Sequence, residues 1–187
     1  MAKINRKFFF DYVRLHLFGG GFKQSQVDGL TAILDYWEAN YSVKDDRWLA
    51  YMLATAHHET DRKFQAIEEY GKGAKHSYGK PDPITKQKYY GRGLVQLTWK
   101  DNYDKMGKQF NKNLLNHPEM ALDLNLSVKI MFYGMTNGSF TSRKLSGYFN
   151  PDKSDWVNAR RIINRLDKAN LIAGYAKQFY AAISYTK

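Results

Sequence analysis

The chain has 187 residues and a formal net charge of +11, from 29 Lys plus Arg against 18 Asp plus Glu. Hydrophobic residues make up 43% of the chain and aromatic residues 16%, which excludes a disordered tail and suffices for one domain with a sizeable core. Because there is no cysteine, the fold depends on no disulfide, and thiolate nucleophiles and cysteine-rich zinc sites are excluded.

The positive charge predicts a polyanionic partner without identifying it, since nucleic acid, anionic lipid and bacterial cell wall all qualify. The Lys and Arg residues are scattered along the chain, which favours a solvated surface over a dedicated nucleic-acid patch. No uncharged apolar stretch approaches the ~18 residues of a membrane-spanning helix, so we expect no stable membrane insertion. Residues 8–10 begin like a secretory signal, but Asp11 and Arg14 interrupt it, and we therefore expect no signal peptide.

Helical periodicity dominates the first sixty residues. After Ser25, which begins a sequence of capping-box form, apolar residues recur at helical spacing over residues 27–37. A second helix is predicted to start at Ser42, with Asp45 three residues later, and to end around residues 58–60.

The middle of the chain has a different character. Residues 71–83 are rich in Gly, Pro and Lys and predict a surface loop. Residues 65–70 and 88–98 on either side have strand character and predict a small hairpin or irregular sheet. Helical patterns return over about 125–135, over 155–165 after a cap at Ser154, and over 171–183. The sequence therefore predicts a mostly helical single domain with a small β element.

Carboxylates are the first candidates for chemistry. Glu59 continues the apolar stripe of its helix and faces a core edge, where loss of solvation disfavours the charged form, as a general acid requires. Periodicity alone favours a structural role for Glu59, at the helix end or paired with an arginine such as Arg92 or Arg161. Glu68-Glu69 could bring a second acid across a groove, as glycoside hydrolysis needs, although adjacent acids are also common on surfaces.

The segment from Gly91 to Thr98 is the candidate for a polar cleft lining. Its glycines permit close backbone approach, and an extended conformation would present Gln96 and Thr98 on one face. The third glycine of a dinucleotide-binding fingerprint is missing. Several aromatic residues lie nearby and suit stacking on sugar faces, although core packing is an equally ordinary role; they are Tyr70, Tyr89, Tyr90, Trp99 and Tyr103.

The histidines do not predict a metal site. His57-His58 lacks the i, i+4 pair of a zinc-binding H-E-x-x-H helix, and His76 and His117 have no ligand spacing with it. We expect packing or hydrogen-bonding histidines, no metal and no cofactor.

Three motifs occur in an order and spacing that resemble the glycoside hydrolase family 19 chitinases, and most of all their phage endolysin relatives. They are His57-His58-Glu59-Thr60, then I-E-E-Y-G at 67–71, then Y-Y-G-R-G-L-V-Q-L-T at 89–98 with Asn102-Tyr103 just after. N-H-P-E at 116–119 and A-R-R-I-I-N at 159–164 also resemble family segments. The resemblance runs from about residue 25 to the C-terminus.

The resemblance implies a lysozyme-like fold, with a cleft between two lobes and the small β-hairpin element lining it, as a single catalytic domain over 1–187. It also implies cleavage of β-1,4 links between N-acetylated amino sugars. In the family pattern Glu59 is the general acid, Glu68 the second acid nine positions later, and Thr98 helps to hold the attacking water. The expected substrate-binding residues are Tyr70, Tyr90, Arg92, Gln96, Asn102, Tyr103, Arg161 and Asn164.

The choice of Glu68 over Glu69 has a geometric consequence. If their segment is extended, the two side chains point to opposite faces, so only one of them can meet Glu59 across the groove. We expect that one to be Glu68.

We therefore expect a peptidoglycan-degrading endolysin of phage or prophage type, a monomer that acts on the glycan strands of the anionic bacterial cell wall. It would wait in the host cytoplasm until lysis and then reach the periplasm and wall. Plant chitinases have Gly-Gly after the residue matching Asn164 and have disulfides, whereas this chain has Arg165-Leu166 and no cysteine, which favours peptidoglycan over chitin.

Four alternatives stay open. A chitinase, or a lytic transglycosylase that uses Glu59 without a water-activating base, would also be a glycan-cleaving enzyme. Outside the enzymes, a non-catalytic glycan-binding module and a basic nucleic-acid-binding protein remain. The presence of Glu59, Glu68 and Thr98 argues against the binding module, and the lack of a nucleic-acid motif argues against the last.

Overall fold

The structure is a computed structural model of the chain and describes residues 3–184. Its α-helices are α1 (Arg6–Leu17), α2 (Gln24–Asn40), α3 (Asp46–Glu59), α4 (Lys100–Phe110), α5 (Leu124–Asn137) and α6 (Ala169–Ile183). Short 3-10 helices are η1 (Ser77–Gly79), η2 (Pro118–Leu122), η3 (Leu145–Gly147) and η4 (Asn158–Ile162). Strands β1 (Phe149–Asn150) and β2 (Lys153–Ser154) form an antiparallel pair. The predicted mainly helical fold is confirmed.

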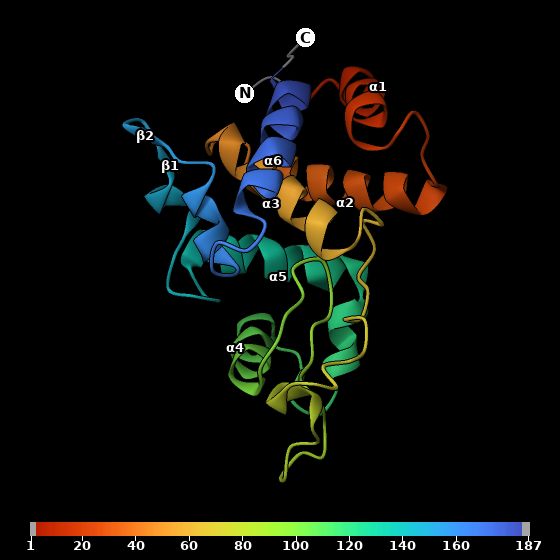
Figure 1. Cartoon of the computed structure of the whole chain (residues 1–187), viewed down its shortest axis with the longest axis vertical. Helices are drawn as coiled ribbons and strands as arrows, with labels where there is room; N and C mark the ends of the chain where they lie inside the picture. The colour runs from red at the N-terminus through yellow and green to blue at the C-terminus, as the bar shows by residue number, and fades with distance from the viewer. Residues whose placement is uncertain (1–2, 185–187) are drawn as a thin grey trace.

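The centre of the core is α3. Its residues from Leu49 to His57 are all buried, and a helix apolar on every side must lie inside the protein. Its most extensive helix contact is with α6, and α1 packs against α6 in turn. Figure 1 shows α1, α2, α3 and α6 gathered in one lobe, while residues 65–123 with α4 form the other and α5 crosses between them. The last residue of α3, Glu59, therefore lies where the lobes meet.

Both early helices exist, but neither predicted start is right. α2 begins one residue before Ser25, and the Gln26 side chain accepts a hydrogen bond from the Lys23 N–H at 2.8 Å. α3 begins after Asp45, whose carboxylate accepts from the Arg47 N–H at 3.0 Å, and not at Ser42. The predicted end of this helix is confirmed.

The predicted hairpin at the cleft is not a regular sheet. Residues 65–70 and 88–98 do lie side by side, but through the isolated bridge Glu68↔Arg92, while the bridge Arg92↔Leu97 lies within the second segment. Positive φ angles at Gly93 (83°) and Gln96 (52°) break the extended run that pairing needs. The sheet of the described residues is the β1–β2 pair instead, and it lies outside the groove.

Of the remaining predicted elements, the structure confirms the loop but not the helix before α6. Residues 71–83 form turns with the short helix η1, as expected of a loop. The helix predicted over 155–165 is only the 3-10 helix η4, and α4 was not predicted. Within residues 3–184, no helix combines the length and apolar character that crossing a membrane requires.

Candidate active site

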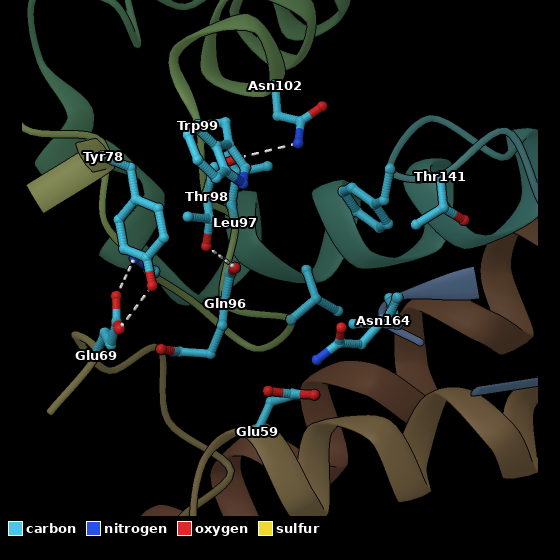
Figure 2. Close-up of a pocket in the computed structure, with 14 residues that line it drawn as sticks. Glu59, Glu69, Tyr78, Gln96, Leu97, Thr98, Trp99, Asn102, Thr141 and Asn164 are labelled. Atoms are coloured by element: carbon cyan, nitrogen blue, oxygen red, sulfur yellow. Dashed lines mark hydrogen bonds between the residues drawn. The ribbon is translucent and has the colours of Figure 1, made fainter. Parts of the chain in front are cut away.

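A groove of about 490 Å³ lies where the C-terminal end of α3 faces the loop over residues 91–99 (Figure 2). It contains two carboxylates, Glu59 and Glu69, and the hydroxyl of Thr98. The amides of Gln96, Asn102 and Asn164 also line it. The groove is thus rich in groups that donate and accept hydrogen bonds, as a site for a polyhydroxylated ligand must be.

Glu59 is fixed at the groove by an arginine. Its Oε1 accepts a hydrogen bond from Arg160 Nη1 at 2.6 Å, and the two side chains are 15% and 3% exposed. Arg160 is held in turn because its Nε donates to the carbonyl of Asp167 at 3.0 Å. The sequence correctly indicated an arginine partner, but the partner is neither Arg92 nor Arg161. The ion pair fixes the position of the carboxylate that the sequence proposed as the general acid.

Glu69 is held in the same groove by two donors from different segments. Its Oε1 accepts from the Tyr78 hydroxyl at 3.1 Å, and its Oε2 accepts from the Gly91 N–H at 3.0 Å. Burial and the neighbouring carboxylate raise the pKa of Tyr78 to about 12, so its hydroxyl keeps its proton near neutral pH. Glu69 is therefore an oriented carboxylate whose two oxygens have fixed donors.

Glu68 was expected to face Glu59, but it is not among the residues that line the groove, and its role as the second acid stays a prediction. Its carboxylate accepts from the Tyr90 hydroxyl and pairs with Lys72 Nζ at 2.9 Å. These hydrogen bonds, together with the charges of Lys72 and Arg92, hold the pKa of Glu68 below its usual range. Adjacent side chains do point to different sides, as predicted, but it is Glu69 that faces the groove.

Three polar residues of the 91–102 segment hold one another in place. Thr98 Oγ1 donates to the Gln96 carbonyl at 2.7 Å, and Asn102 Nδ2 donates to the Thr98 carbonyl at 2.9 Å. Gln96 Nε2 donates to the carbonyls of Ile67 and Gly93 at 3.2 and 3.0 Å. The structure thus brings Gln96, Thr98 and Asn102 to the groove, where Asn164 joins them. Their contact with a substrate stays a prediction.

Tyr90, Arg92 and Tyr103 lie behind the groove wall and do not reach its surface. Tyr103 is fully buried and donates to the Tyr90 carbonyl at 2.7 Å. Arg92 Nη1 donates to the Tyr103 hydroxyl at 2.9 Å, and its guanidinium lies 3.7 Å from the centre of the Tyr90 ring. All three pack beneath the loop and support it, and their contact with a substrate stays a prediction.

Tyr70 and Arg161 also lie outside the groove. Tyr70 is 67% exposed, and its hydroxyl accepts from Lys63 Nζ at 2.6 Å on the outer surface. Arg161 lines a smaller pocket that adjoins the groove. Of the predicted binding residues, these two are placed at or beyond the edge of the site.

Several residues that line the groove were not predicted from the sequence. Tyr78 lies in the loop predicted only as surface, and Phe140 and Thr141 follow the end of α5. Trp99 was noted among nearby aromatics; it is 53% exposed and packs edge-on to Tyr78 at 5.0 Å. No local pattern marked Arg160, whose role depends on a contact with a residue 101 positions away.

The histidine beside Glu59 packs in the core. His57 is 1% exposed and its ring contacts those of Phe18, Phe64, Tyr175 and Phe179. Burial lowers the pKa of His57 to about 4. Residues 3–184 contain no cluster of three or more His, Cys, Asp or Glu side chains that could hold a metal ion.

The fold and groove define a class first: two oriented carboxylates in one groove between helical lobes are the equipment of a glycosidase. Residues 47–174 match the family described as chitinase class I, glycoside hydrolase family 19, and the chain belongs to this family.

Similar proteins include plant enzymes. The chain is 46% identical over 61 residues to Endochitinase CHI of Arabidopsis thaliana, covering 32% of this chain and 22% of the relative. It is 35% identical over 91 residues to the acidic endochitinase of Petunia hybrida, covering 46% and 35%. The matches thus span about a third or less of these relatives. An inactive chitinase-like protein 1 of Hevea brasiliensis is 41% identical over 58 residues, covering 28% of this chain and 18% of the relative.

Solved structures support the fold. Chitinase C from Streptomyces griseus HUT6037 superposes with a TM-score of 0.67 at 20% identity, covering 99% of this chain and 78% of that one. A class IV family 19 chitinase from Zea mays gives 0.54 at 20% identity, covering 88% and 82%. At such identities the likeness concerns the fold alone.

Proposed function

We propose that this protein is an endolysin that hydrolyses the β-1,4 glycosidic bonds of bacterial peptidoglycan. The observation that carries the proposal is the pair of carboxylates, Glu59 and Glu69, held in one groove together with the Thr98 hydroxyl. Hydrolysis of a glycosidic bond with inversion needs one acid to protonate the leaving oxygen and one base to activate water on the other face of the sugar.

In the proposed mechanism Glu59 is the general acid and Glu69 the base. Glu59 gives its proton to the glycosidic oxygen, and the adjacent Arg160 stabilises the carboxylate that results. Glu69 takes a proton from water, whose oxygen bonds to the anomeric carbon as the glycosidic bond breaks. Thr98 donates its hydroxyl hydrogen to the Gln96 carbonyl, which leaves its lone pairs free to accept from that water. Glu69 thus takes the role first expected of Glu68.

Charge supports peptidoglycan as the substrate. A protein of net charge +11 is attracted to an anionic wall, whereas chitin is uncharged and gains nothing from this field. The proposal includes a monomeric lysin that acts from the host cytoplasm outward at lysis and has neither nucleic acid nor membrane as its partner.

A chitinase is the second candidate, and the names of the similar proteins favour it. Purified peptidoglycan and chitin oligosaccharides, digested in ¹⁸O-labelled water and analysed by mass spectrometry, separate the candidates. Muropeptides with labelled reducing ends support the proposal, and labelled products from chitin alone support the chitinase. 1,6-Anhydromuropeptides would indicate a lytic transglycosylase, and no product from either substrate would indicate a binding module.

A further inference from the structure

A second pocket, of about 250 Å³, continues the groove on the side of Asn164. Thr141, Ile163 and Asn164 line both cavities, so the two share a wall. The other residues that line the second pocket are Arg143, Arg161 and Arg165. A ligand that fills the groove past Asn164 therefore meets a pocket lined by three arginines.

These arginines have no acidic partners in the part of the chain that the structure describes. Arg143 and Arg165 are exposed and Arg161 is half-buried, and none of the three forms an ion pair within residues 3–184. Arg161 Nε donates to Asn158 Oδ1 at a long 3.4 Å, which occupies one of its five donors. The amide of Asn158 is itself held by Asp155, at 3.1 Å from each carboxylate oxygen.

Three positive charges around one concavity raise the electrostatic potential inside it. This positive potential favours the binding of an anion there. The planar fork of arginine matches carboxylate oxygens with two parallel hydrogen bonds. In Figure 2, Asn164 lies beside Glu59 and Thr141 lies beyond it, so the arginine pocket is near the acid that the proposed mechanism uses.

We propose that the arginine pocket, formed by Arg143, Arg161 and Arg165, binds carboxylates of the peptide stem carried by the sugar next to the cleaved bond. This inference rests on the proposed function, and it makes the pocket the part of the site that distinguishes peptidoglycan from chitin. The sugars of chitin carry uncharged N-acetyl groups and offer no counterion to these arginines.

The test uses two soluble substrates with the same glycan backbone, both free of phosphate groups. One keeps its peptide stems, and an amidase has removed the peptide stems from the other. An exposed charge pair changes affinity by about 1.4- to fivefold, so three pairs of about twofold each should change it on the order of tenfold. For wild type, KM should be about tenfold lower on stem-bearing strands. R143Q/R161Q/R165Q should raise that KM about tenfold, with kcat within about twofold and the KM for stripped strands unchanged.

Two further variants control for poor folding and for the loss of net charge. R143Q/R165Q keeps Arg161 and its contact with Asn158, and should give a smaller rise in KM even if the triple variant folds poorly. K112Q/K129Q/K177Q replaces exposed lysines outside both cavities and lowers the formal net charge by the same three, from +11 to +8. This control should leave KM on both soluble substrates unchanged.

Different outcomes refute the arginine pocket and the proposed hydrolase activity. Equal KM values for both substrates in wild type, unaltered in the arginine variants, would overturn the arginine pocket while the hydrolase proposal stands. A rise in KM that is the same for stripped strands would also overturn it, because the arginines would then contact the sugars. If wild type cleaved neither substrate, the proposed function itself would fail and the inference with it.

Discussion

Glu59→Gln should nearly abolish activity without unfolding the protein. The amide cannot give a proton to the leaving oxygen, and loss of general acid catalysis lowers kcat by about 100- to 10,000-fold. The amide oxygen can still accept the hydrogen bond that Arg160 Nη1 now makes to the carboxylate at 2.6 Å. The substitution therefore removes the transferable proton while keeping the shape of the site.

Substitution of Glu59 should also lower the free energy of unfolding, because it breaks the ion pair with Arg160. Arg160 is 3% exposed, so losing its counterion leaves a buried positive charge that only neutral acceptors solvate. Breaking a buried ion pair costs about 3–5 kcal/mol when a partner is deleted, and Glu59→Ala should fall in this range. Because Gln keeps an acceptor and the groove admits water, Glu59→Gln should cost about 2 kcal/mol. For a domain of this size that lowers Tm by about 4–8 °C.

Turnover of purified peptidoglycan and differential scanning calorimetry measure the two effects on the same sample. Glu119→Gln is a matched control, because Glu119 is 61% exposed and lies outside the groove. It should keep wild-type kcat and Tm. A folded Glu59→Gln protein with more than a tenth of wild-type turnover would refute the assignment of the acid. An unchanged Tm would refute the energetic role of the Arg160 ion pair.

Four further outcomes are expected. Glu69→Gln should lower kcat at least about 100-fold and Glu68→Gln far less, as steady-state turnover will show; a larger loss from Glu68→Gln would restore that residue as the base. Thr98→Val should slow turnover without unfolding the protein, since it keeps the shape of the side chain and removes only the hydroxyl. Burial lowers the pKa of His57 to about 4 from 6.5, so the unfolded chain binds a proton at a higher pH than the folded protein does. The free energy of unfolding should therefore fall by about 3 kcal/mol as the pH is lowered from 6.5 to 4. Denaturant titrations at several pH values should show a weaker dependence of this free energy on pH in His57→Leu. Lysis of whole cell walls should weaken steeply with added salt, because a Debye length of ~10 Å at 0.1 M screens the +11 charge, whereas hydrolysis of short soluble fragments should change little.

The long amphipathic helices could be predicted because burial repeats along them at a regular spacing. The stripe over residues 27–37 and the last stripe of the chain correspond to α2 and α6. α4 escaped prediction because only Tyr103, Met106 and Gly107 are buried within it, which is too short a stripe to stand out. The helix starts were wrong because several polar residues near each start can cap, and tertiary contacts decide among them.

The sequence pattern could not decide which of two adjacent acids lines the groove. Periodicity shows that Glu68 and Glu69 point apart, but it cannot show which of them faces Glu59. That depends on the partner segment: Gly91 accepts from the Glu69 N–H at 2.7 Å and donates back to its carboxylate. The bridge Glu68↔Arg92 then leaves Glu68 on the side of Lys72 and Tyr90. The register of two loops selects the residue.

The motif Y-Y-G-R-G-L-V-Q-L-T contains residues that build the groove as well as residues that face it. A Cβ on Gly93, which has φ of 83°, would lie 2.5 Å from Ser127 Oγ, and one on Gly91 would lie 2.8 Å from Gln96 Oε1. Arg92, buried between these glycines, donates to the Lys88 carbonyl at 3.0 Å and to the Tyr103 hydroxyl. These contacts fix the loop backbone, and only then do Gln96 and Thr98 line the groove. A motif match therefore marks the site region, while side-chain burial decides which of its members can touch a substrate.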